Sequence, residues 1–594
     1  MNDADFEVWL AGQAADAERE RERVVRDAED AERALAIEAM GAVTTSAPRP
    51  PSPKRKRKRH TPTYKPVVLL PGQAEHMERL RGILLRFPFA LDLSMLGAGK
   101  TYTSAYLAQH GIDGTPFKHI VVICPVSVLH KWKFMEQEFG LPITHAIGYQ
   151  ELRSRTCHQP KHGLLHRRDF TVVNEVFATS PKVEFTCSDE YRAMVDEGTL
   201  LIVDEVQNIK NVSSQFLAAQ TMIKEITRRV GSGLVTPTLF QQVAGITPCA
   251  SRVLVLSGSP IDQKEHATHL FRALGVMTAE RVAQYNIHTR VNDWRGMREI
   301  HTFCFRIDAA ATLAIPPQYR ESRLDPYIYR LFQGVFKRAC SSAMTTSSTA
   351  VTLTKQNAFY NVDEASAVIL QRGLYNLSSA ARFNGTTVSF GPSDAGGMQL
   401  AGVSRAMQII ETGKISMLIR IVKAALETPQ AKVVVAVNYV DTVSDLKAGL
   451  AEYAPLLLVG STTHSRRKIV LELFQEASVR HRLLICNQSV ASTGIDLDDK
   501  HGDFPRTCFV SPNYSTITSY QLGHRFLRLD TRSHSSVHFV YAKREGKSAD
   551  ECSDIIELPV LNALSKKSVI MKETTTEQVA AGIVFPGDHP EWEE

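Results

Sequence analysis

The sequence lacks several features that would place it in other protein classes. Its 594 residues contain no apolar run of about 18 residues or more, so no segment is expected to span a membrane. The N-terminus is acidic and has neither the basic start nor the apolar core of a secretory signal peptide. The nine cysteines include no C-x-x-C pair, which favours reduced thiols over a disulfide framework.

The amino-acid composition and the length are typical of a globular protein with several domains. Hydrophobic residues make up 43% and charged residues 22% of the chain. The net charge of +6 conceals an asymmetry, because residues 1–40 hold 12 acidic side chains against 5 arginines. The rest of the chain is therefore strongly basic, which is compatible with a polyanionic partner such as nucleic acid.

The first 60 residues form a charged helical segment followed by a basic linker. Residues 1–40 favour a helix, either one that binds a protein partner or one that is only solvated. Six consecutive cations follow at Lys54–Arg59, between prolines. This run predicts a nuclear localisation signal, with a non-specific nucleic-acid arm as the alternative; without import the protein would be cytoplasmic.

A glycine-rich turn separates an apolar run, residues 89–93, from a segment that suits a helix. It reads Gly97-Ala98-Gly99-Lys100-Thr101. Backbone N–H groups of such a turn cradle phosphate oxygens, and the helix N-terminus adds favourable potential. Lys100 is expected to reach the terminal phosphates and Thr101 to ligate Mg²⁺. Ser94 occupies the first position of the G-x-x-x-x-G-K-[ST] pattern, where glycine is usual.

A second apolar run, Leu201-Ile202-Val203, ends in the paired carboxylates of Asp204 and Glu205. In a nucleotide site, Asp204 would hold Mg²⁺ through a water, and Glu205 would orient and deprotonate the attacking water. The position of the pair at the end of a hydrophobic strand, about 100 residues after the phosphate loop, favours this function over a surface acidic pair.

Short apolar runs alternate with amphipathic stretches twice along the chain, which predicts two α/β lobes with parallel sheets. We expect the following domains: 1–60 charged helix and basic linker, 61–275 first α/β lobe, 276–410 connecting segment with helical insertions, 411–560 second α/β lobe, and 561–594 C-terminal tail. The predicted strands are Ala90–Leu93, His119–Cys124, Leu200–Val203, Arg252–Leu256, Lys432–Val437, Leu456–Gly460, Leu483–Cys486, Thr507–Val510 and Val537–Val540.

These pieces, in this order, resemble a superfamily-two helicase with an Asp-Glu-x-His/Gln box, closest in texture to Swi/Snf-type ATPases and the related ATPases of large DNA viruses. The resemblance runs from about Leu70 to Arg528. It rests on the phosphate loop, the Asp204–Glu205 box and four further elements: Ile123–Trp132, Leu256–Ile261, Ser492–Leu497 and Gln521–Arg528. The family implies two RecA-like lobes that clamp ATP and move along nucleic acid.

The resemblance also implies roles for single residues. Gln73 would read the adenine, Gly494 would permit close backbone approach, and Asp496 would hold an interlobe network. In the Q-x-x-G-R-x-x-R pattern, Gln521 opens the motif, and Arg525 and Arg528 would act as arginine fingers. The predicted site is therefore Glu205, Gln521, Arg525 and Arg528 for catalysis; Gln73, Gly97, Gly99, Lys100, Thr101, Asp204, Gly494 and Asp496 for ATP; and Thr101 and Asp204 for Mg²⁺.

Four positions depart from the family pattern without removing any predicted catalytic group: Ser94, Val206, Ser259 and His524. We therefore expect a working ATP hydrolase that contacts nucleic acid, DNA in preference to RNA, mainly at phosphates. Two alternatives stay open, a double-strand translocase or remodeller and an ATP-gated transcription factor of viral type. The localisation signal and the resemblance together predict a nucleus, which an infected host could supply.

Overall fold

The computed structural model describes residues 64–574 with internal gaps. The residues outside the description are 1–63, 155–160, 174–178, 231–249, 287–289, 318–323, 345–350, 381, 384–387, 390–395, 493, 529, 545–553 and 575–594. Tyr64–Glu594 forms one unit, which contains both lobes described below. The basic run at residues 54–59 and the charged segment before it lie outside the described residues. Among the described helices, none has both the length and the apolar character needed to cross a membrane.

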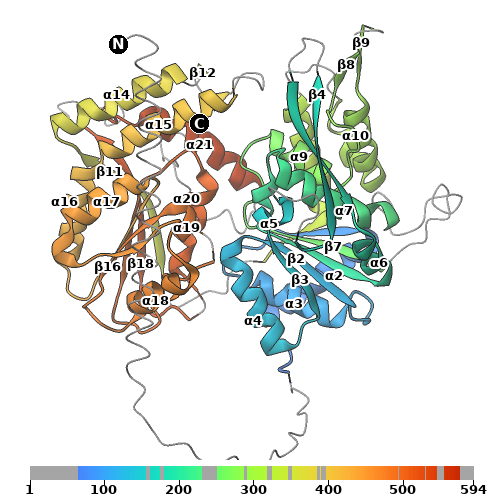
Figure 1. The fold of residues 1–594 in the computed structure, drawn as a ribbon, viewed down its shortest axis with the longest axis horizontal. Helices are drawn as coiled ribbons and strands as arrows, with labels where there is room; N and C mark the ends of the chain where they lie inside the picture. Colours follow the sequence, from blue (N-terminus) through green and yellow to red (C-terminus); the bar gives the residue numbers. More distant parts are fainter. Residues whose placement is uncertain are drawn as a thin grey trace, which may run out of the picture. The chain divides into compact units, whose positions relative to one another are not determined.

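A six-stranded sheet organises the first lobe (Figure 1). Its strand order is β10-β1-β7-β6-β2-β3, and every neighbouring pair is parallel. Parallel pairs need crossover connections, which the intervening helices supply. The strands are β1 (Phe89–Asp92), β2 (His119–Cys124), β3 (Ile143–Gly148), β6 (Thr199–Asp204), β7 (Arg252–Leu256) and β10 (Ser341–Ser342).

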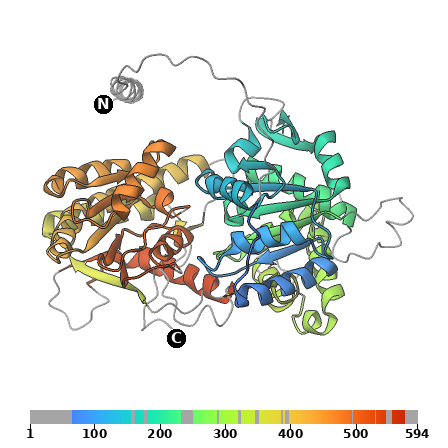
Figure 2. The ribbon, with the colours of Figure 1, turned by 90° about the horizontal axis from the view of Figure 1, so that it is seen from below.

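Helices cover this sheet on both faces, because successive side chains of each strand point to opposite sides. In β2, for example, Val121 and Ile123 pack into one hydrophobic cluster, and Ile120 and Val122 pack into another. Figure 2 shows the blue helices α2 and α3 beside the strands of their lobe. The helices are α2 (Pro71–Arg86), α3 (Lys100–His110), α4 (Leu129–Phe139), α5 (Tyr149–Arg153), α6 (Asp189–Glu197), α7 (Ser214–Val230) and α9 (Glu265–Ala273).

A second six-stranded parallel sheet organises the second lobe, in the order β11-β18-β17-β14-β16-β15. Two parallel sheets in tandem confirm the predicted α/β fold class of two RecA-like lobes. The strands are β11 (Leu353–Asn361), β14 (Lys432–Val437), β15 (Leu456–Leu458), β16 (Leu483–Asn487), β17 (Arg506–Val510) and β18 (Ser535–Lys543); the helices are α16 (Ile415–Leu426), α17 (Val440–Gly449), α18 (His464–Gln475), α19 (Gln488–Ala491) and α20 (Thr516–Gly523).

The connecting segment contributes an edge strand to each sheet, so its elements belong to the lobes. Strand β10 pairs with β1 in the first sheet, and β11 pairs with β18 in the second. The exact domain boundaries remain predictions. The helical elements of the segment are α10 (Arg295–Ile307), α11 (Ala309–Leu313), α12 (Leu324–Leu331), the π-helix η4 (Phe332–Phe336), α13 (Lys337–Cys340), α14 (Glu364–Ala380) and α15 (Gly396–Thr412).

Three antiparallel hairpins lie outside the two main sheets, and none was predicted. They pair β4 (Leu165–Val173) with β5 (Thr179–Cys187), β8 (Gln284–Asn286) with β9 (Val291–Asp293), and β12 (Arg382–Phe383) with β13 (Val388–Ser389). Their residues mix charges with apolar side chains, so they lack the continuous apolar runs by which the buried strands are recognised.

The last described helix, α21 (Leu558–Thr574), contacts both lobes. Its Met571 is fully buried in a small cluster with Leu96 of the phosphate loop and with Ile517 and Tyr520 of α20. Near its end, the Tyr329 hydroxyl donates to Glu573 Oε2 over 2.9 Å. Part of the predicted C-terminal tail is therefore a packed helix that joins the phosphate loop to the second lobe.

Candidate nucleotide site

The phosphate loop connects the end of β1 to the first turn of α3. Gly97 and Gly99 have φ of 88° and 93°, a region that favours glycine. Lys100 is the first helical residue, and its Nζ donates to the backbone oxygens of Ser94 at 2.9 Å and Met95 at 3.2 Å. The side chain thus folds back over its own loop, where a phosphate would be cradled.

Ser94 replaces the usual glycine at the start of this loop and is fully buried. Its hydroxyl donates to Asp92, and the Met344 backbone N–H donates to it over 3.0 Å. His76 Nε2 lies 3.3 Å from the same hydroxyl and 3.2 Å from Asp92 Oδ2. The serine therefore anchors the loop to α2 and to the residues after β10, and its polar group is satisfied.

Gln73 lies against the phosphate loop. Its Nε2 donates to the Ala98 backbone oxygen over 3.0 Å, and its Oε1 accepts from the Leu70 backbone N–H over 3.1 Å. A Cβ on Gly99 would come within 2.3 Å of the Gln73 Nε2. Glycine is therefore favoured at position 99 by its backbone conformation, and a larger residue there would also displace the end of the Gln73 side chain.

The electrostatic environment of Lys100 favours an anionic ligand. Burial lowers the pKa of Lys100, while the charges of Asp92, Glu205 and Asp204 raise it, and the net result is a lowered pKa. A phosphate in the loop would bring further negative charge to this ammonium group and restore its pKa.

Asp204 ends strand β6 and is positioned by two aromatic residues. The Trp132 indole N–H donates to its Oδ2 over 3.1 Å, and the Tyr149 hydroxyl donates to its backbone oxygen over 2.8 Å. Burial, followed by the adjacent charge of Glu205, raises the pKa of Asp204 to about 7. A cation bound here would stabilise the charged carboxylate and so lower its pKa again.

Glu205 receives hydrogen bonds from both lobes. Its backbone is left-handed, with φ and ψ of 58°, so the chain turns sharply after β6 and the side chain leaves the strand direction. Its Oε2 accepts from Gln207 Nε2 at 2.6 Å and from Gln521 Nε2, in the second lobe, at 2.9 Å. The Glu205–Gln521 contact joins the carboxylate to the motif that carries the predicted arginine fingers.

Gln207 also connects Glu205 to the segment after β7. The Ser257 hydroxyl donates to Gln207 Oε1 over 2.7 Å and accepts from the Ser259 backbone N–H over 3.0 Å. This chain of bonds runs from the Leu256–Ile261 element of the resemblance to the predicted base Glu205.

Gly494 and Asp496 face the first lobe. Gly494 has φ of 74°, and a Cβ there would meet the Ser127 backbone oxygen at 2.4 Å. Asp496 Oδ1 accepts from Arg528 Nε at 2.8 Å and lies 3.9 Å from Lys131 Nζ. Burial alone would raise the pKa of Asp496, but Arg528 and Lys131 outweigh it and lower the pKa to about 2.

The two predicted arginine fingers have different surroundings. Arg525 Nε donates to the Ser492 backbone oxygen at 2.8 Å, and burial lowers the Arg525 pKa to about 10, against the opposing charges of Glu205 and Asp204. Arg528 is engaged by Asp496 and by the backbone oxygen of His524, 2.6 Å from its Nη1. Arg525 is therefore the finger that the structure brings under the influence of the acidic pair.

The structure thus brings together the predicted residues of both lobes, while their roles stay predictions. Gln73, Gly97, Gly99 and Lys100 form or contact the loop, and Asp204, Glu205, Gln521 and Arg525 are linked to it by hydrogen bonds or charge. Thr101, the predicted Mg²⁺ ligand, follows Lys100 on α3. Gly494, Asp496 and Arg528 form a neighbouring interlobe contact.

Sequence reasoning missed the residues that orient the acidic pair. The sequence places Trp132 in the Ile123–Trp132 element and Gln207 in the acidic box, and it gives neither of them a role in orienting the acidic pair. No spacing signal marks Tyr149, since it comes from the short helix α5 after an edge strand. Only the hydrogen bond from its hydroxyl to the Asp204 backbone oxygen reveals its function.

The residues present fit Mg²⁺–ATP. The left-handed glycines open the loop, Lys100 is short of negative charge, and the Thr101 hydroxyl has no hydrogen-bond partner within the described part of the chain. Mg²⁺ here would be held by Thr101 and, through water, by Asp204, together with the nucleotide phosphates. Accordingly, the described residues contain no cluster of three or more acidic, His or Cys side chains, and the site requires none.

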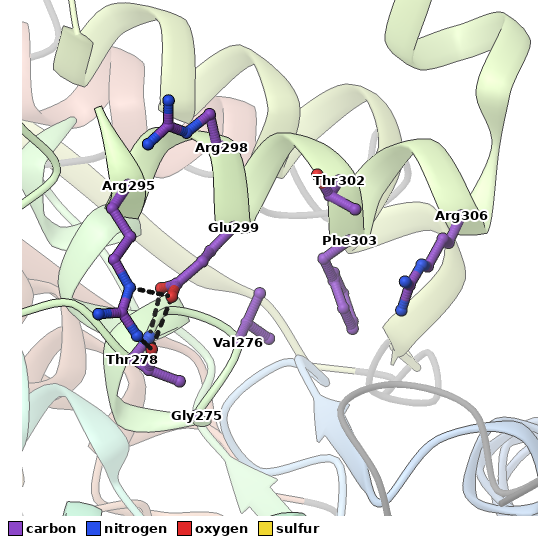
Figure 3. Close-up of a pocket in the computed structure, with 9 residues that line it drawn as sticks. All are labelled: Gly275, Val276, Thr278, Arg295, Arg298, Glu299, Thr302, Phe303 and Arg306. Atoms are coloured by element: carbon purple, nitrogen blue, oxygen red, sulfur yellow. Dashed lines mark hydrogen bonds and ion pairs between the residues drawn. The ribbon is translucent and has the colours of Figure 1, made fainter. Parts of the chain in front are cut away.

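A cavity of about 390 Å³ lies elsewhere, between α10 and the loop after α9 (Figure 3). Arg295 Nε donates to Glu299 Oε1 over 3.1 Å, and Thr278 Oγ1 donates to the same oxygen over 2.6 Å. None of the predicted site residues lines this cavity. It has no glycine-rich phosphate loop, so we do not assign the nucleotide to it.

Comparison with known proteins gives relatives of one class. No family model matches the sequence. The putative ATP-dependent RNA helicase L364 of Acanthamoeba polyphaga mimivirus is 21% identical over 450 residues, which cover 75% of this chain and 73% of the relative.

Solved structures that align with the chain have low scores on superposition. The Sulfolobus solfataricus SWI2/SNF2 ATPase core in complex with dsDNA covers 88% of this chain and 98% of its own, with 15% identity and a TM-score of 0.27. The Pyrococcus furiosus Hef helicase domain covers 79% and 94%, with 12% identity and a TM-score of 0.36. Scores this low carry no weight for function or for the arrangement of the lobes.

The ordered motifs, the two parallel sheets and the viral relative identify the chain as a helicase-like ATPase. The predicted resemblance is thereby confirmed. The chain is an ATP hydrolase of helicase type, and at this coarse level it belongs among ATP-dependent nucleic-acid translocases and helicases.

Proposed function

We propose that this chain couples hydrolysis of Mg²⁺–ATP between its two lobes to movement along DNA. The observation that carries the proposal is the hydrogen bond between Gln521 Nε2 of the second lobe and Glu205 Oε2 of the first, at 2.9 Å. Through it, any displacement of the second lobe changes the environment of the carboxylate that would activate water. Hydrolysis and lobe movement are then linked in both directions.

Each group has a role that follows from its position. Lys100 and the backbone N–H groups of the loop bind the terminal phosphates, and Gln73, which contacts this loop, is proposed to read the adenine as the resemblance implies. Mg²⁺, when bound, would neutralise part of the negative charge of the phosphates. Glu205 orients the attacking water and accepts its proton, while Gln207 and Gln521 fix the carboxylate. Arg525 stabilises the negative charge that develops on the transferred phosphoryl group.

Nucleic acid would be gripped mainly through phosphates, by residues of both lobes. Ser127 and Lys131 follow β2, and Lys131 is close to Asp496 of the second lobe. Arg467, on α18, is a further candidate, since it is held by the backbone oxygens of Thr462 and Gly460. Contacts of this kind carry little sequence preference and weaken steeply with salt.

We propose DNA as the nucleic acid along which the protein moves. The order of motifs resembles Swi/Snf-type ATPases, and the basic run at residues 54–59 predicts nuclear import. The viral relative is named an RNA helicase, which supports RNA as the alternative. The proposed location is the nucleus, and a fusion of residues 1–60 to a fluorescent protein tests it. Cytoplasmic fluorescence of that fusion would contradict the import signal.

An ATPase titration with four nucleic acids tests the proposed function. Purified full-length chain is assayed with single- and double-stranded DNA and RNA, with Mg²⁺ present or chelated. We expect hydrolysis that requires Mg²⁺ and is stimulated most by DNA. Greater stimulation by RNA would change the substrate, and no hydrolysis with any of the four would overturn the proposal.

Strand displacement separates the helicase from its alternatives. Stimulation by duplex DNA without release of a labelled strand would indicate a double-strand translocase or remodeller. An ATP-gated transcription factor would instead lose complex formation when residues 1–60 are deleted, while its ATPase activity stays intact.

A further inference from the structure

A half-buried lysine from the connecting segment contacts the motif that carries the predicted arginine fingers. Lys355 lies on β11, the edge strand of the second sheet, opposite Val537 of β18. Its Nζ is 2.6 Å from His524 Nε2. His524 occupies the position at which the family pattern has glycine, so the pattern itself offers no partner for such a lysine.

The surroundings make this contact well defined. The His524 and Tyr520 rings lie edge to face with centroids 4.5 Å apart, and Lys355 Nζ is 5.5 Å from the centre of the Tyr520 ring. A Cβ on Gly523 would come within 3.8 Å of the Lys355 methylene groups. The lysine stem therefore lies along the end of α20, and its amine reaches the first residue of η6 (His524–Phe526).

The histidine in turn lies among the residues that face the nucleotide site. Gln521, three residues before it, donates to Glu205, and Arg525 follows it directly. The His524 backbone oxygen accepts from Arg528 Nη1 over 2.6 Å. A shift of His524 would therefore move both arginines and the glutamine.

When Lys355 is an ammonium, its Nζ donates the hydrogen bond, and His524 Nε2 must then be unprotonated to accept it. Burial lowers the pKa of His524 well below its ordinary value, and four positive neighbours lower it further: Lys355, Arg528, Arg525 and Lys100. Burial also lowers the pKa of Lys355, to about 7. An ammonium at position 355 is a stronger donor than a neutral amine, so the contact is strongest below neutral pH.

We propose that Lys355 is a positioning residue for the predicted arginine finger Arg525, acting through a partly buried hydrogen bond to His524. The proposal rests on the proposed ATP hydrolysis and names a residue outside every motif of the resemblance. If so, the turnover rate depends on the Lys355–His524 contact, while ATP binding depends on it little. The reason is that Arg525 stabilises charge that develops only during the reaction.

A double-mutant cycle tests the proposal. Full-length wild type, Lys355→Met, His524→Gly and the double variant are compared for kcat and KM with saturating nucleic acid. We expect each single variant to lower kcat about tenfold with KM changed less than about twofold, and the double variant to equal either single one. Additive losses, or an unchanged kcat in Lys355→Met, would overturn the proposal.

A conservative variant and a matched control guard against loss of folding. His524→Gln keeps an acceptor for the lysine and should recover most of kcat. Gln356→Met removes the neighbouring contact on the same two strands, where Gln356 Nε2 lies 3.1 Å from His538 Nδ1, and should leave kcat unchanged. Loss of kcat in this control would assign the effect to the strand and overturn the positioning role.

The pH profile supplies a readout that a merely structural role would not move. The kcat ratio of wild type to Lys355→Met should fall as pH rises from about 6.5 to 8.5, because the ammonium of Lys355 loses its proton in this range. A constant ratio would contradict the proposal. If the wild type itself had no ATPase activity, the proposed function would be overturned instead. Failure of the positioning role and failure of the proposed function are therefore distinguishable.

Discussion

Asp204 in the first lobe and Asp496 in the second lie close to the contact between the lobes, yet their pKa values move in opposite directions. Burial raises the pKa of Asp204 to about 7, and the neighbouring Glu205 carboxylate adds to the rise. Burial also acts to raise the pKa of Asp496, but Arg528 and Lys131 lower it to about 2.

The difference shows that the lobes bring complementary charge to the site. The first lobe presents two acids that need a cation, which bound Mg²⁺ and the Arg525 guanidinium would provide. The second lobe presents Arg525 and Arg528. The negative charge of its acid, Asp496, is already neutralised by the ion pair with Arg528. Each lobe alone is electrostatically incomplete, so binding of nucleotide between them is favoured.

The largest expected effect comes from removing the positive charge that the second lobe offers. Arg525→Ala should lower kcat on the order of 10³-fold, because an arginine finger stabilises charge that appears only in the transition state. ATP binding, measured with a fluorescent analogue, should change far less. Arg480→Ala, an exposed arginine of the same lobe, is the control. Equal losses in binding and turnover would assign Arg525 to ground-state binding.

The acid of the first lobe gives the next effect. Glu205→Gln should lower kcat about 10²-fold or more and leave ATP binding intact, because the amide keeps the shape but cannot accept a proton. Steady-state ATPase and equilibrium binding measure the two separately. Turnover near the wild-type rate in this variant would remove Glu205 from the role of base.

A pH-dependent Mg²⁺ requirement would sharpen the contrast between the two aspartates. The raised pKa of Asp204, about 7, means that protons compete with Mg²⁺ below neutral pH, and the carboxylate is free to bind as pH rises. The Mg²⁺ concentration for half-maximal activity should fall about tenfold from pH 6 to pH 8. Asp204→Asn should abolish the shift, and an unchanged shift would implicate another group.

The smallest effect is expected at the ion pair between the lobes. Lys131 Nζ and Asp496 Oδ1 are 3.9 Å apart, and both side chains are about one third exposed. Lys131→Met should change ATPase activity by no more than about fivefold, since such pairs contribute little and are screened by salt. A larger loss would indicate that Lys131 contacts the nucleotide or, as proposed above, nucleic acid, and only a loss due to the nucleic-acid contact would depend steeply on salt.

The buried strands could be predicted because both their faces are covered. All six residues of β6 and of β14 are buried, and the strands contain the continuous apolar runs Leu200–Val203 and Val433–Val437. Edge strands such as β3 and β11 were missed because half-buried positions alternate with polar ones. The same limit hid the part of α21 within the predicted tail, since its packing partners come from two other regions.

The sequence by itself determined the chemistry of the site, because the phosphate loop, the acidic pair and the arginines are defined by residue type, spacing and order. Only the tertiary structure decided which groups hold them in place. Trp132, Tyr149 and Lys355 lie far along the chain from the atoms they orient. Hydrogen bonds between distant segments depend on the approach of strands and helices in space, and no local pattern encodes that approach.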